Sequence, residues 1–119
     1  MKLISLLLIG FVALEHLGFL VLEMALWDHP IGRRVFRTSP EVAAASKALA
    51  ANQGLYNGFL AAGLVWGLWA DRLDVKLFFL CCVIAAGLFG ALTVSGRILV
   101  VQALPAMLAL VATWAASQS

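Results

Sequence analysis

Residues 3–27 read LISLLLIGFVALEHLGFLVLEMALW. The run is strongly apolar, and its only ionisable residues are Glu15, His16 and Glu23. A helix needs about 20 apolar residues to cross the hydrocarbon core of a membrane, and the apolar region of a signal peptide is shorter than this run. No small-x-small cleavage site follows it. The stretch therefore predicts a retained transmembrane helix.

The rest of the chain has the same apolar character. Of its 119 residues, 64% are hydrophobic and 12% are charged, whereas a soluble domain has about 25% charged residues. Further apolar runs predict membrane spans at about residues 52–70, 75–94 and 98–116. Short links make consecutive helices antiparallel neighbours. The sequence therefore predicts an all-α, four-helix up-down transmembrane bundle that occupies residues 1–119 as a single transmembrane domain.

The longest polar stretch, residues 28–51, follows the first span. Thr38 or Ser39 is expected to cap a helix with Pro40 in its first turn, since a hydroxyl can bond the free N–H groups there. The Ala-rich segment that follows would lie in or above the membrane interface, because a helix from Pro40 to Ala70 is longer than the hydrocarbon core requires.

The distribution of basic residues predicts an orientation. Residues 28–51 and 95–97 carry five basic residues, and the opposite side carries three. The larger group is Arg33, Arg34, Arg37, Lys47 and Arg97, and the smaller is Lys2, Arg72 and Lys76. Because Lys and Arg are enriched in cytoplasmic loops, we expect a multi-pass protein of a plasma or inner membrane with residues 28–51 and 95–97 in the cytoplasm.

Glu15, His16 and Glu23 are the candidate acid–base group. A carboxylate at the middle of a membrane helix costs about 2.5–3.5 kcal/mol, so these side chains are expected to face the bundle interior. Neighbouring groups of this kind in a low-dielectric site can exchange protons near neutral pH.

A second set of polar residues predicts a ligand-binding vestibule. Asn52, Gln53, Tyr56 and Asn57 form one contiguous helix face at the start of the second span, and Gln102 lies near the start of the fourth. Pro105 adds to this polarity by removing the helical donor of the Val101 carbonyl. Glu15 and His16 would form the floor of the vestibule. Each amide could instead form an ordinary bond between helices.

Several segments resemble a known family. They include Ala13-Leu14-Glu15-His16, Leu22-Glu23-Met24 and Val101-Gln102-Ala103-Leu104-Pro105, and the most specific is Ala51-Asn52-Gln53-Gly54-Leu55-Tyr56-Asn57-Gly58. Together with the glycine-containing segment 82–94, they resemble the domain-of-unknown-function family 1304. The resemblance implies a small four-span membrane protein and no particular reaction.

These patterns favour a pocket in the lipid bilayer for a small, mostly apolar ligand, and they leave open whether the protein is an enzyme. The alternatives are a proton-coupled transporter or channel, which would need a homo-oligomer, and a purely structural membrane protein. No metal site is predicted, because His16 and Glu23 lie about 10 Å apart along one helix. The sequence indicates no particular cofactor. The net charge of +2 is too small and scattered to indicate nucleic-acid binding.

Overall fold

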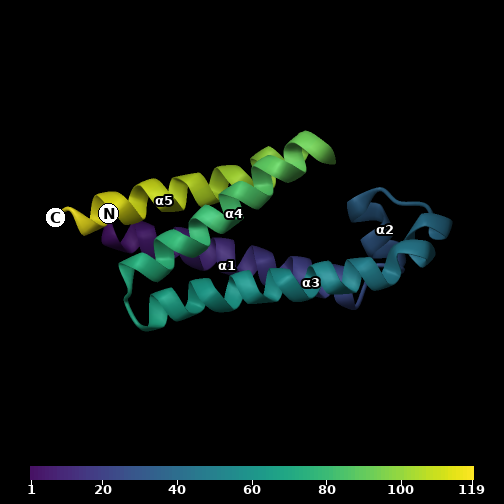
Figure 1. Ribbon diagram of the computed structural model, residues 1–119, viewed down its shortest axis with the longest axis horizontal. Coiled ribbons are helices and arrows are strands. Elements are labelled where there is room, and N and C mark those ends of the chain that lie inside the picture. The colour runs from purple at the N-terminus through teal and green to yellow at the C-terminus, as the bar shows by residue number, and fades with distance from the viewer. The chain divides into compact units, whose positions relative to one another are not determined.

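The computed structural model describes residues 1–119 and contains helices joined by short links, with no strands (Figure 1). Its elements are α1 (Lys2–Met24), α2 (Pro30–Phe36), α3 (Pro40–Trp69), α4 (Leu73–Thr93), the π-helical turn η1 (Leu99–Ala103) and α5 (Leu104–Ser117). The predicted all-α class is therefore confirmed.

Three helical segments are long and apolar enough to cross a membrane, namely Lys2–Met24, Leu73–Thr93 and Leu99–Ser117. The whole of α3 is long enough, but the amides at the centre of the helix and the Ala-rich turns before them make it less apolar. These lengths and compositions are those of a membrane protein.

The chain divides into two compact units, and the first contains Met1–Leu14 and Leu60–Ser119. Its core takes side chains from α1, α3, α4 and α5, with Ile9, Leu64, Leu80 and Ala106 fully buried. In this unit α4 lies next to η1 and α5 (Figure 1). Small residues permit the close contact, since a Cβ added at Gly87 would lie 2.9 Å from the Cβ of Ala103.

The second unit is Glu15–Phe59, which contains the end of α1, α2 and the first part of α3. The N–H of Val42 donates to the Ser39 hydroxyl at 3.2 Å, so the capping predicted for Thr38 or Ser39 is confirmed at Ser39. The helix α2 was not expected. His29 caps it by accepting from the N–H of Ile31 at 3.2 Å, and Pro30 occupies its first turn.

The first helix ends at Met24, before the predicted limit at Trp27. The Trp27 indole N–H donates to the Ser46 hydroxyl at 3.1 Å, and its ring centroid lies 4.9 Å from that of Phe36. The chain thus leaves the helix where Trp27 gains partners in α2 and α3.

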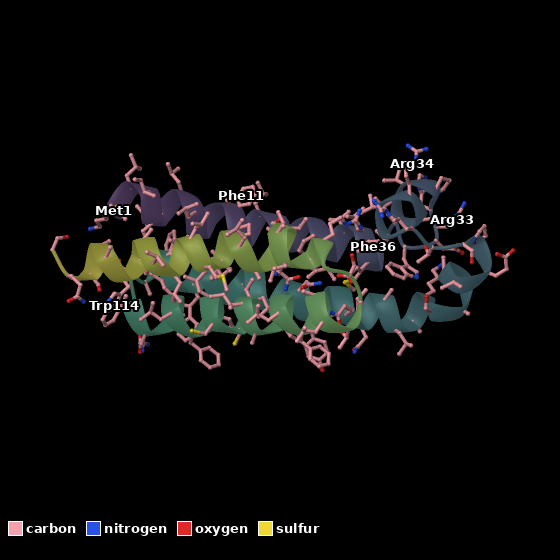
Figure 2. The ribbon with its side chains drawn as sticks, turned by 90° about the horizontal axis from the view of Figure 1, so that it is seen from above. Met1, Phe11, Arg33, Arg34, Phe36 and Trp114 are labelled. Atoms are coloured by element: carbon pink, nitrogen blue, oxygen red, sulfur yellow. The ribbon has the colours of Figure 1, made fainter.

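Apolar side chains cover the outside of the helices as well as the core. The exposed fraction is 67% for Leu3, 52% for Phe11, 68% for Phe89 and 54% for Trp114. Figure 2 shows the side chains of Phe11 and Trp114 on the outside of the ribbon. An apolar exterior of this extent is suited to lipid, because water would make it an aggregation surface.

Candidate functional site

The buried face of α1 contains both apolar and ionisable residues. Ser5, Ile9, Val12, His16 and Glu23 recur at helical spacing along one face of α1. The exposed fraction is 0% for His16 and 9% for Glu23. Both side chains therefore avoid the apolar exterior, as expected from the cost of placing a charge in hydrocarbon.

Glu23 has a specific partner on α3. The side-chain amide of Asn57 donates a hydrogen bond to the Glu23 carboxylate, and Asn57 is itself only 7% exposed. Both residues belong to the second unit. The contact joins one residue of the predicted acid–base group to one residue of the predicted ligand-binding set.

Close approach of the two helices makes this bond possible. A Cβ added at Gly54 would lie 2.7 Å from Met24 Cγ, 3.0 Å from Glu23 Cβ and 3.2 Å from the backbone oxygen of Leu20. Gly54 lies about one helical turn before Asn57, on the same face of α3. Because Gly54 has no side chain, the backbone of α1 can lie close enough to α3 for Glu23 to reach the Asn57 amide.

Glu15 and His16 follow one another on α1, so their side chains leave the helix about 100° apart. Glu15 is partly exposed, but its Oε1 atom is buried and has no hydrogen-bond partner. The His16 ring packs edge-on against Phe19, with 5.1 Å between the ring centroids. Glu15 is therefore the residue of the group with an unused acceptor.

The other predicted ligand-binding residues have different surroundings. Asn52, Gln53 and Tyr56 are exposed on α3, and the Tyr56 ring lies 5.6 Å from that of Phe59. Gln102 is partly buried in η1 and belongs to the first unit. The vestibule that would gather all of them stays a prediction.

The turn that contains Gln102 is a π-helix, which the sequence did not predict. The N–H of Leu104 donates to the carbonyl of Leu99, five residues before it. Pro105 follows directly and has no N–H to donate. The helix thus widens before its proline, and such turns are frequent at functional sites.

Sequence reasoning missed a polar cluster in the first unit. The Lys76 ammonium lies 2.9 Å from the Asp71 carboxylate, and the hydroxyls of Ser5 and Thr113 are hydrogen-bonded at 2.7 Å. Each pair joins residues that look unremarkable alone, and Ser5 and Thr113 are 108 positions apart. The available signal was a lysine placed just inside an otherwise apolar run.

Comparison with known proteins gives two matches. A family model described as "Protein of unknown function (DUF1304)" matches residues 10–114. The uncharacterized protein YpaA of Lactococcus lactis subsp. lactis (strain IL1403) is 30% identical over 118 residues, which covers 96% of this chain and 99% of the relative. No solved structure matches the chain.

Proposed function

The chain belongs to the DUF1304 family, and from the structure of this member we propose an integral, multi-pass membrane protein that binds a small, mostly apolar molecule. The residues that resemble this family in the sequence lie within the matched region. Since the family's description names no activity, the proposal is derived from the site.

The proposed architecture has four spans in an up-down arrangement, with α3 as the span that is not apolar enough by composition alone. Two observations support its insertion. The Asn57 amide is bonded to Glu23 inside the protein, which lowers the cost of placing both in a membrane. Farther along α3, Gly63 packs directly on the Phe79 ring of α4, in the manner of transmembrane helix contacts.

The hydrogen bond from Asn57 to Glu23 is the observation that carries the ligand proposal. It orients a carboxyl group in the protein interior, on the same face of α1 as buried His16. Glu15 adds a buried oxygen with no partner. A ligand with one hydroxyl group and an apolar body would donate to that oxygen and fit a largely apolar site.

Each residue then has a role. Glu15 binds the polar group of the ligand, the adjacent His16 exchanges a proton with the Glu15 carboxyl group, and Glu23 is held by Asn57. Asn52, Gln53 and Tyr56, which belong to the same unit, would line the approach to the site. Acid–base chemistry such as a proton-shifting isomerisation or a hydrolysis would need no further groups.

A ligand-stabilisation assay tests this proposal. We would measure the melting temperature of the purified protein in neutral detergent with medium-chain aliphatic alcohols, aldehydes and fatty acids. At least one class should raise it in the wild type, and the increase should be lost in Glu15→Gln and reduced in Glu23→Gln. Glu41→Gln is the control, because Glu41 is an exposed carboxylate at the start of α3. Unchanged binding and unchanged stability in both site variants would refute the proposal.

A proton-coupled transporter or channel is the second candidate. Glu15 and His16 are adjacent on α1 and Glu23 lies about 10 Å farther along the helix, so bridging water molecules would have to complete a proton relay between them. The small number of spans would require a homo-oligomer. Flux coupled to a pH gradient in proteoliposomes, lost in Glu15→Gln, would favour this function. If Glu15→Gln and Glu23→Gln both lower the melting temperature and the wild type binds none of the probes, the polar residues have a structural role.

A further inference from the structure

A polar pocket lies at one end of the first unit, where apolar helices begin and end. It has a volume of about 360 Å³ and is formed by the start of α1, the α3–α4 link, the start of α4 and the end of α5. Figure 1 shows the start of α1 beside the end of α5. The polar residues that matter for the argument are Lys2, Ser5, Asp71, Lys76, Thr113 and Ser117. We refer to this site as the Lys2–Lys76 pocket.

Lys76 is the central residue of the pocket. It is only 8% exposed, and its ammonium donates to the Asp71 carboxylate at 2.9 Å. The Asp71 side chain, in contrast, is 71% exposed. An ammonium group has three donors, so Lys76 retains donors for a ligand after its bond with Asp71. A buried cation whose partner is an exposed carboxylate can exchange that partner for another anion.

The other wall supplies hydroxyl groups and a second cation. Ser5 and Thr113 are each 3% exposed and bond one another at 2.7 Å. In such a pair one hydroxyl proton is used and the other is free to be donated. Lys2 also lines the pocket, and its charge, after that of Lys76, contributes to lowering the pKa of Asp71. The charged side chains that line the pocket are therefore two ammonium groups and one carboxylate.

The surroundings indicate the kind of ligand. Lys2 and Ser117 are end residues of apolar segments long enough to cross a membrane, so the pocket lies at the boundary of those segments. In the same unit Trp66, Trp69 and Trp114 are 51%, 91% and 54% exposed, as in the aromatic belt at a membrane interface. Leu6 and Leu73 line the pocket as well. A ligand with an anionic head and an apolar body would contact both kinds of surface.

We propose that the Lys2–Lys76 pocket binds the phosphate group of an anionic phospholipid headgroup. A phosphate offers several acceptor oxygens to the two ammonium groups and the free hydroxyl proton. It would replace the Asp71 carboxylate at Lys76, or share the ammonium with it. The acyl chains would extend from the pocket along Leu6 and Leu73 into the bilayer. The proposal is independent of Glu15, His16 and Glu23.

Binding can be measured with the full chain purified in neutral detergent. The probes are phosphatidylglycerol, phosphatidylcholine, glycerol phosphate and inorganic phosphate, each titrated while the melting temperature is followed. We expect phosphatidylglycerol to bind more tightly than phosphatidylcholine, because the choline ammonium would meet two lysines. An equal response to glycerol phosphate or inorganic phosphate would assign the pocket to soluble phosphate compounds. Equal binding of phosphatidylcholine and phosphatidylglycerol would refute the proposal.

Variants locate the binding site. Lys2→Gln should weaken phosphatidylglycerol binding about fivefold, and Lys76→Met about tenfold or more, because it removes a charge-assisted hydrogen bond. Asp71→Asn should strengthen binding several-fold by removing the competing carboxylate. Lys47→Gln, an exposed lysine of the second unit, is the control. If Lys76→Met does not fold, Lys2→Gln and Asp71→Asn still test whether phosphatidylglycerol binds in the Lys2–Lys76 pocket. Wild-type affinity for phosphatidylglycerol in both variants would refute binding at this pocket.

Discussion

At the scale of single residues, the bond between Asn57 and Glu23 determines whether the polar group on α1 is tolerated. Asn57→Leu would leave the Glu23 carboxyl without its donor in a buried position. We expect a loss of about 0.6–1.7 kcal/mol of stability, the range for hydrogen bonds between side chains inside membrane proteins. A denaturant titration in mixed micelles measures it. Asn52→Leu, at an exposed position of the same helix, should have little effect. Equal losses in the two variants would show that the bond is not stabilising.

Gly54 and Gly58 of α3 differ in how much space each leaves for a side chain. A Cβ at Gly54 would meet the Leu20 backbone oxygen at 3.2 Å as well as two side-chain atoms, whereas a Cβ at Gly58 would meet the flexible Leu20 side chain. Gly54→Ala should therefore destabilise the protein by about 1–3 kcal/mol. Gly58→Ala should be close to neutral, because a rotamer change relieves its contact and alanine favours the helix. Thermal unfolding of both variants tests this order, and a larger loss for Gly58→Ala would contradict the helix contact.

Asp71 gives stability a specific dependence on pH. Hydrogen bonding and charge attraction from Lys76 hold the pKa of Asp71 below its ordinary value of 3.8. A carboxyl group whose pKa is lower in the folded state stabilises the fold above the ordinary value, and this contribution disappears as the pH falls through the folded value. The wild type should therefore lose stability below about pH 4.

Asp71→Asn is the variant that isolates this effect, because Asn also tolerates the positive φ of 49° found at Asp71. Its melting temperature should change less than that of the wild type between about pH 3 and pH 5. Lys76→Met removes the partner and should flatten the curve in the same way. A wild-type slope in both variants would show that the ion pair does not contribute.

At the scale of elements, the start of α3 depends on one hydroxyl. Ser39 accepts from the N–H of Val42, whereas the buried hydroxyl oxygen of Thr38 has no hydrogen-bond partner. Ser39→Ala should cost about 1 kcal/mol, the usual value for a helix cap. Thr38→Ala, the matched control, should cost clearly less. Chemical denaturation or hydrogen exchange at residues 40–44 would measure both, and the reverse order would move the cap to Thr38.

Helix positions could be predicted mainly from apolar length and from capping residues. Those signals predicted helices near α1 and α4 and the start of α3. They did not reveal α2, whose seven residues are too few for a periodic pattern, although Pro30 is typical of the first turn of a helix. The π-helical turn was also missed, since Pro105 predicts a lost hydrogen bond and not how the chain adjusts to it.

The candidate site also contains features that the sequence could predict and features that it could not. Glu23 and Asn57 lie at similar distances in sequence from the polar stretch 28–51, so the sequence could predict that they lie at a similar depth. The exposed positions of Asn52, Gln53 and Tyr56 could not be predicted, because a polar helix face is wider than the strip that contacts a neighbour. The contact between Ser5 and Thr113 requires the tertiary structure.

At the scale of the whole molecule, the distribution of charge predicts which side of the membrane each loop faces. The proposed cytoplasmic stretch contains Arg34, which projects away from α2 in Figure 2, and Arg37 and Lys47 are exposed as well. In the smaller basic group, Lys76 pairs with Asp71 and Arg72 pairs with Asp74. Counting Lys and Arg alone already favours residues 28–51 in the cytoplasm, because the translocation of basic loops is disfavoured.

Cysteine labelling in sealed membrane vesicles of known orientation tests this topology. Cys81 and Cys82 are free thiols and would first be replaced by serine or alanine. In right-side-out vesicles, a membrane-impermeant maleimide should label Ser119→Cys and should label Arg34→Cys only after the vesicles are opened. Adding arginines beside Ser119 should then weaken or reverse this pattern, because the charge difference between the two sides is small. Labelling of Arg34→Cys in closed vesicles would invert the orientation and place the Lys2–Lys76 pocket at the cytoplasmic leaflet, where anionic lipids are concentrated.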